Sequence, residues 1–194
     1  MKYQPPGMNS FVQVAAYHIK QKNVLTQDPI NTNYSIQTGE IRSQGVEVEG
    51  RASLTSNIDL IGTYSYIDAE VTRSTTANVQ GKRPQQVPEH IASAWANYRF
   101  NDGFLRGLSL GAGVRYVGST YGDETNSFKV SDFTLFDAAV RYDVGERFPQ
   151  AKGLELTLNA NNIADKAYVS SCSSSNACYF GDRLLVIAGA RVRW

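Results

Sequence analysis

The sequence is short of several features that would place it in a common class of protein. It has two cysteines and two histidines among 194 residues, which leaves few ligands for a metal centre and few general bases for catalysis. Its 19 Lys and Arg nearly balance its 18 Asp and Glu, and a net charge of +1 argues against nucleic-acid binding through a strongly basic surface. We therefore expect neither an enzyme nor a nucleic-acid-binding protein.

Long apolar runs are missing as well. No stretch approaches the roughly 18 consecutive apolar residues that a membrane-spanning helix needs, which excludes a helical membrane protein. The first seven residues, MKYQPPG, lack the apolar segment of a secretory signal. The sequence is therefore expected to be either cytoplasmic or a chain whose front end is missing.

What the sequence does contain is alternation of apolar and polar residues with a period of two, the pattern of β-strands. In residues 108–117 one face reads Leu, Leu, Ala, Val, Tyr and the other reads Ser, Gly, Gly, Arg, Val. Only the first strand is ambiguous in its facing. The alternation predicts about eight strands, near residues 11–24, 34–49, 58–67, 90–100, 108–117, 136–143, 154–161 and 184–194.

The connections between these strands alternate between short and long. Asn and Asp interrupt the alternation at residues 162–168, which predicts a turn that ends a strand. Tyrosine, phenylalanine and a final tryptophan cluster at the ends of the apolar faces, as aromatic girdles do at a membrane interface. These features favour an antiparallel transmembrane β-barrel segment over a soluble β-sandwich. The strands of a sandwich also alternate between apolar and polar residues, because one face of each sheet is exposed to solvent.

The two cysteines, Cys172 and Cys178, flank a polar stretch in the last long connection. Two thiolates fall short of a four-ligand zinc site, because His18 and His90 lie far away on other strands. A small disulfide ring is geometrically easy at this spacing and fits an oxidising environment. We therefore expect a disulfide at this position and no metal site.

Five stretches follow one another in a fixed order: RSQGVEVEG at residues 42–50, YSYIDAE at 64–70, VPEH at 87–90 leading into a tryptophan, NNIADKAY at 161–168, and a last strand ending in an aromatic residue. In this order and at these spacings they resemble the C-terminal third of TonB-dependent outer-membrane receptors. The cysteine pair followed by Tyr-Phe-Gly is similar to the ferrichrome-type, or hydroxamate, siderophore receptors in particular.

The resemblance implies a 22-stranded barrel with an N-terminal plug inside, of which residues 1–194 form the last eight strands. The plug and the earlier strands would then be absent, and the chain would be a fragment with an internal start. The implied function is uptake of ferric siderophores across the bacterial outer membrane, powered by the TonB energy-transducing complex through the absent plug domain. The ferric siderophore is then a transported ligand, and no resident cofactor is expected.

Candidate residues for siderophore contact are the aromatic side chains near the cysteine pair and in the preceding long connection: Tyr179, Phe180, Tyr121 and Phe128. Aromatic rings suit a compact, partly apolar ferric hydroxamate, because they bury area without demanding charge. The same residues would suit a membrane girdle equally well. Ferrichrome-type receptors resemble one another in placing an aromatic residue of this ring on the siderophore, whereas Ser173 follows the first cysteine in this chain, so the ligand is left open.

The C-terminal end of the chain carries a further expectation. Trp194, with Val192 upstream, resembles the signal that the outer-membrane assembly machinery reads on barrel proteins. The expected partners are therefore this machinery and the lipid bilayer, besides the siderophore and TonB.

The polar faces of the strands are expected to line an aqueous lumen. Glu47 and Glu49 are expected to meet lumen charges such as Arg99 or Arg115, as wall contacts and not as transport chemistry. An alternative is a complete small eight-stranded outer-membrane barrel with a structural or adhesive role, for which 194 residues suffice. The missing signal sequence and the small residues on the polar face of residues 108–117 argue against it, since such an interior is filled by side chains.

Overall fold

The computed structural model describes residues 1–7 and 9–194. All eight predicted strands are present, and a short ninth strand, β1, lies at one edge. The sheet consists of β1 (Lys2–Tyr3), β2 (Ser10–Gln27), β3 (Ser35–Ser53), β4 (Ile58–Arg73), β5 (His90–Arg99), β6 (Leu108–Val117), β9 (Phe133–Asp143), β10 (Leu154–Asn161) and β13 (Leu185–Val192). Two small hairpins, β7 (Thr120–Tyr121) with β8 (Lys129–Val130) and β11 (Val169–Ser174) with β12 (Ala177–Phe180), lie outside this sheet.

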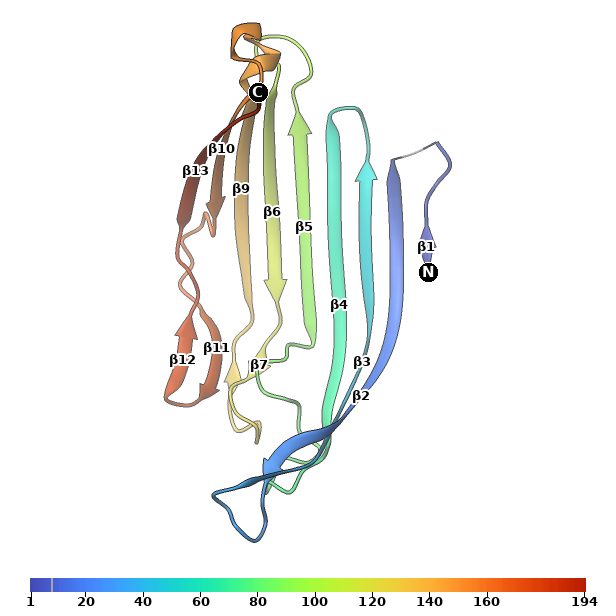
Figure 1. Cartoon of the computed structure of the whole chain (residues 1–194), viewed down its shortest axis with the longest axis vertical. Coiled ribbons are helices and arrows are strands. Elements are labelled where there is room, and N and C mark those ends of the chain that lie inside the picture. Colours follow the sequence, from blue (N-terminus) through green and yellow to red (C-terminus); the bar gives the residue numbers. More distant parts are fainter. Residues whose placement is uncertain (8) are drawn as a thin grey trace.

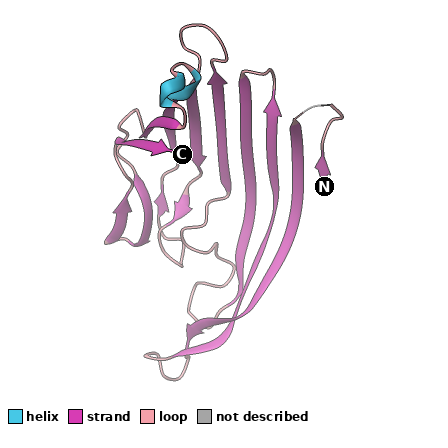
Figure 2. Ribbon diagram, turned by 45° about the horizontal axis from the view of Figure 1, so that its top comes forward, coloured by secondary structure: helices cyan, strands magenta, loops and turns pink. Residues whose placement is uncertain are grey.

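The nine strands form one antiparallel sheet in which each long strand pairs with its neighbours in the chain (Figure 1). Short turns gather at one end, where the 3-10 helices η1 (Val144–Glu146) and η2 (Pro149–Ala151) lie. Long loops and both hairpins gather at the other end (Figure 2). Outer-membrane barrels, which the sequence resembles, have short periplasmic turns and longer extracellular loops, so we assign the loop end to the extracellular side.

One face of the sheet carries the large apolar side chains, and aromatic residues border it on both sides. At the extracellular side, Tyr64 and Tyr116 both stand opposite Ala92 of β5. Tyr116 pairs with Thr134, and Tyr142 lies eight residues further along β9, which is about 20 Å in height for a strand tilted by about 40°. This separation is close to the ~25 Å apolar band of outer-membrane barrels, so we assign this face to lipid.

Strands β2, β3 and β4 continue well past the aromatic border on the extracellular side. Their lengths of 18, 19 and 16 residues compare with 10 for β5 and β6. Beyond the border, positions on the same face of the sheet become charged. Arg42 binds Glu70 at 2.7 Å, and Lys20 binds Glu40 at 3.0 Å. The change from tyrosine to ion pairs marks where these strands leave the membrane.

The opposite face is polar, as a lumen wall requires, but one predicted contact there is wrong. Arg115 was expected to meet Glu47 or Glu49; instead its guanidinium binds both carboxylate oxygens of Asp137 on β9, at 2.5 and 2.9 Å. The register explains the difference, because Arg115 lies next to the β9 strand, whereas Glu49 is three strands away on β3.

No helix among the described residues is long and apolar enough to cross a membrane.

Candidate ligand-binding site

The last extracellular connection folds into its own hairpin, which we call the disulfide hairpin (β11 and β12). Cys172 stands directly opposite Cys178 across the two strands. A disulfide joins them, with the two sulfur atoms 2.01 Å apart, and Cys172 is buried. The bond therefore closes a compact ring at the tip of the hairpin.

Three extracellular segments are tied together by side-chain amides. Gln86, in the β4–β5 loop, donates from Nε2 to the carbonyl of Cys172 at 2.9 Å, and its backbone N–H donates to the carbonyl of Tyr121 at 2.9 Å. Asn126, in the β6–β9 loop, accepts from the N–H of Arg83 at 2.9 Å and donates to its carbonyl at 2.8 Å. The two loops and the disulfide hairpin consequently form one connected assembly.

A cavity of about 740 Å³, the hairpin pocket, lies between the β6–β9 loop and the disulfide hairpin. The cysteine pair lies at its wall, and Lys129, Asp132 and Lys166 supply charge. A largely apolar cavity with a few charged groups suits a compact ligand whose outer surface is partly apolar. Its apolar lining comes from Phe128, Val130, Tyr168, Val169 and Phe180.

The four predicted contact residues do not all meet in this pocket. Phe128 and Phe180 line it from opposite segments, and Phe180 is 78% exposed. Tyr121 pairs with Lys129 across the β7–β8 hairpin, where the Lys129 ammonium lies 5.5 Å from its ring centre. Tyr179 is exposed and lies outside the lining.

The position of Phe128 depends on the turn that precedes it. The Phe128 ring lies against Gly122 so closely that a Cβ on this glycine would overlap the ring, and the same Cβ would lie 3.0 Å from Cβ of Cys172. Hydrogen bonds to the carboxylate of Asp123, first from the Thr125 hydroxyl and then from Ser127, lower the pKa of Asp123 below its ordinary value. The turn thus keeps a charged acceptor at neutral pH and holds Phe128 toward the hairpin.

Sequence reasoning missed the residues that build the pocket around the aromatic rings. Tyr168 packs on Phe133 with ring centres 4.3 Å apart, and Gly181 leaves room for the Tyr168 ring. Gln86, with φ of 65°, carried no signal beyond its place in a long polar loop. These residues act through contacts between loops, which no local pattern reports.

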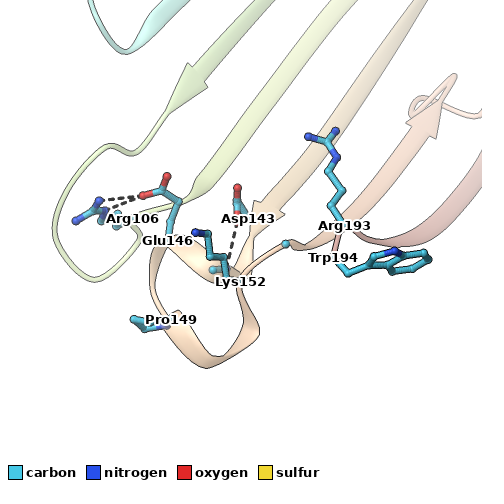
Figure 3. Close-up of a pocket in the computed structure, with 9 residues that line it drawn as sticks. Arg106, Asp143, Glu146, Pro149, Lys152, Arg193 and Trp194 are labelled. Atoms are coloured by element: carbon cyan, nitrogen blue, oxygen red, sulfur yellow. Dashed lines mark hydrogen bonds and ion pairs between the residues drawn. The ribbon is translucent and has the colours of Figure 1, made fainter.

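A second cavity, of about 840 Å³, lies at the periplasmic end (Figure 3). Arg106 and Glu146 form an ion pair at 3.0 Å on one side of it, Trp194 lies on the other, and Lys152 lies between them. Trp194 is fully exposed, and Val192, at the end of β13, is 58% exposed. The lining is mixed in charge and built from short turns, so we take the hairpin pocket as the candidate ligand site.

Comparison with known proteins places the chain in a family. The β-barrel profile described as TonB dependent receptor-like matches residues 1–163. The chain belongs to the TonB-dependent receptors. It is 44% identical over 194 residues to the ferrichrome outer membrane transporter/phage receptor of Escherichia coli (strain K12), covering all of this chain and 25% of that protein. It is 39% identical over 195 residues to the ferrioxamine B receptor of Salmonella typhimurium (strain SL1344), covering 100% of this chain and 27% of that protein.

Solved structures of siderophore and uptake receptors share the fold. The siderophore receptor PiuA from Acinetobacter baumannii superposes with a TM-score of 0.80 at 24% identity, covering 98% of this chain and 27% of that one. The ferric yersiniabactin uptake receptor from Yersinia pestis gives 0.79 at 16% identity, covering 98% and 28%. The chain is therefore a section of an outer-membrane β-barrel wall, and it spans about a quarter of the length of the curated relatives it matches.

Proposed function

We propose that this chain is the C-terminal part of a receptor that imports ferric siderophores, with ferrichrome-like hydroxamates as the ligand class. The hairpin pocket is the observation that carries this proposal. Phe128 and Phe180 present apolar area at the extracellular end, and Lys129 and Lys166 can reach polar groups of a ligand. The 44% identity to a ferrichrome transporter supports a hydroxamate ligand. The 39% identity to a ferrioxamine B receptor makes ferrioxamine B a second hydroxamate to be tested.

In this proposal the chain supplies wall, lumen and extracellular loops, and other parts of the receptor supply energy coupling. Among the described residues the edge strands β1 and β13 do not pair with each other, and the two-residue β1 covers only a small part of β2, so the sheet has two open edges. A bilayer does not tolerate open sheet edges, because unsatisfied backbone groups cost several kcal/mol each. This supports further strands beside β13 and beside β1 and the uncovered part of β2. The plug domain that would meet the TonB complex is part of the proposal through the family resemblance. The ferric siderophore is cargo and not a resident cofactor.

The rival function is a complete eight-stranded barrel with a structural or adhesive role. An immunoblot of isolated outer membranes, with an antibody against residues 170–181, separates the two. A band several-fold heavier than 21.4 kDa supports the receptor, whereas a heat-modifiable band at the mass of this chain supports the small barrel.

Ligand class is tested by growth and binding. The receptor containing this chain is expressed in an iron-starved strain that lacks other siderophore receptors, and growth is measured with ferrichrome, ferrioxamine B or a ferric catecholate. We expect growth on ferrichrome. Growth on the catecholate alone would overturn the hydroxamate assignment.

The pocket residues are tested by comparing phenylalanines at the extracellular end of the sheet with one at the periplasmic end. Phe128→Ala and Phe180→Ala are expected to weaken ferrichrome binding by about ten-fold each, since each removes a large apolar contact. Phe104→Ala is the matched control, because Phe104 is 82% exposed in the β5–β6 turn at the periplasmic end. Equal affinities for all three variants and the parent would place the ligand elsewhere.

A further inference from the structure

The least exposed polar residue in the described part of the chain lies where β10 ends, at the base of the disulfide hairpin. Asn162 is 2% exposed and adopts a left-handed backbone conformation with φ of 52°, which turns the chain out of the sheet. Left-handed conformations are rare for residues other than glycine, and Asn is among those that adopt them most readily. A buried amide at such a turn must find hydrogen-bond partners or cost free energy.

The Asn162 side chain finds partners on both legs of the hairpin. On the outgoing leg it donates to the carbonyl of Lys166 at 2.9 Å and accepts from the N–H of Lys166 at 2.9 Å. On the returning leg it donates to the carbonyl of Asp182 at 3.0 Å. One side chain therefore fixes the separation of the two legs.

The barrel wall holds Asn162 in turn. Its backbone N–H donates to Oδ1 of Asp137 on β9 at 2.9 Å, and that carboxylate is the one gripped by Arg115 of β6. Asp137 is buried, and a buried carboxylate needs hydrogen-bond donors to stabilise its charge, which Arg115 and the Asn162 N–H supply. The base of the hairpin is thus fastened to two wall strands through a single carboxylate.

A second link between the legs lies at the surface. Arg183 on the returning leg donates to both carboxylate oxygens of Asp165, at 2.8 and 2.6 Å, and both side chains are at least half exposed. Exposed ion pairs stabilise little, because water and salt screen them. Asp165 therefore offers a matched control that joins the same two legs without burial.

We propose that Asn162 and Asp137 are positioning residues for ligand recognition, which set the angle of the disulfide hairpin and thereby the width of the hairpin pocket. This inference rests on the proposed function for its ligand. The pocket wall on one side, Val169, Cys172 and Phe180, belongs to the hairpin, whereas Phe128 belongs to the β6–β9 loop. Releasing the hairpin base separates the two walls, so ligand binding weakens while the later transport step proceeds unchanged.

The first test needs no ligand. Hydrogen exchange is measured on the complete receptor containing this chain, for Asn162→Ala, Asn162→Asp and the control Asp165→Asn. In Asn162→Ala we expect residues 169–180 to exchange at least ten-fold faster while β6 and β9 keep their protection. Asn162→Asp retains the acceptor for the Lys166 N–H and is expected to fall between. Unchanged exchange in residues 169–180 of Asn162→Ala would overturn the inference.

The second test measures ferrichrome uptake by the same variants in cells. Asn162→Ala and Asp137→Asn are expected to raise KM about ten-fold with the maximal rate per surface receptor unchanged, and Asp165→Asn to change neither. A fall in the maximal rate with constant KM would overturn the positioning role. If the parent receptor takes no siderophore while Asn162→Ala still speeds exchange, the proposed function fails and the anchoring of the hairpin stands.

Should Asn162→Ala fail to assemble, Asp137→Asn is the substitute for both tests. It keeps an oxygen acceptor for the Asn162 N–H and removes the charge that Arg115 grips. Faster exchange confined to residues 169–180 supports the inference in this variant too, and loss of protection first in β6 or β9 contradicts it.

Discussion

The indole ring of Trp95 on β5 lies flat over Gly113 and Gly111 of β6, so closely that a Cβ on either glycine would overlap it. Trp95 stands directly opposite Gly113, on the polar face of the sheet. An aromatic ring that covers a strand glycine restores the packing that the missing side chain leaves out. The bulk of the lumen wall here comes from β5, so small residues on β6 are not the sign of an empty interior.

This packing predicts the effect of Gly113→Val. The added side chain must displace the Trp95 ring, and overpacking of this kind costs about 1–3 kcal/mol. We expect the receptor to lose its heat-modifiable, folded band at a lower temperature on unboiled gels. Gly62→Val is the control, because the nearest atom to a Cβ at Gly62 is a carbonyl oxygen at 3.8 Å. Equal melting of the two variants would contradict the packing.

The strands could be predicted from the sequence because the environment of each strand determines the pattern of its own residues. A wall strand meets lipid on one side and water on the other, so alternation within ten residues is enough to find it. The facing of β2 was not predictable in this way. It is fixed across the sheet, where Tyr17 stands opposite Gly45 and fills the space over that glycine.

The candidate site was predictable only in part, for a physical reason. The two cysteines lie six residues apart in one polar stretch, so the disulfide ring could be predicted from the local sequence. The link from Gln86 to Cys172 joins residues 86 apart, and loops carry no periodicity that would reveal it. The turn predicted at residues 162–168 is confirmed by two hydrogen bonds between the Asn162 side chain and the backbone of Lys166. The third bond of this side chain, to Asp182, depends on the return of the chain.

Cys172→Ser tests the disulfide. Losing the link of a six-residue ring removes about 2 kcal/mol of loop-closure stabilisation, so we expect a looser hairpin on an assembled barrel. Thiol titration after denaturation without reductant should find no free thiol from Cys172 or Cys178 in the parent and one, from Cys178, in the variant. Two thiols in the parent would exclude the bond, and loss of the barrel band in the variant would assign the disulfide a role in assembly.

The Asp165–Arg183 ion pair predicts that the stability of the hairpin base depends on pH. The bidentate Arg183 and the N–H of Leu184 lower the pKa of Asp165 below its ordinary value of 3.8. A carboxyl whose pKa is lower in the folded state stabilises that state above the unfolded pKa and loses the contribution as pH falls through the folded pKa. We expect proteolysis within residues 162–184 to be unchanged between pH 5 and 8 and to rise below about pH 4. Asp165→Asn lacks the titrating carboxyl and should show no such rise, and its proteolysis between pH 5 and 8 should exceed that of the parent only slightly, because the exposed pair stabilises little.

Trp194 gives the prediction for assembly. It is fully exposed beyond β13, where an aromatic side chain suits the periplasmic membrane interface. We predict that the assembly machinery recognises this side chain. Deleting Trp194 from the receptor is expected to lower its surface level several-fold, whereas Trp194→Phe keeps an aromatic ring and should retain most of it. Surface labelling of intact cells measures both. A normal surface level for the deletion would show that assembly reads another part of the strand, of which Val192 is the nearest exposed apolar residue.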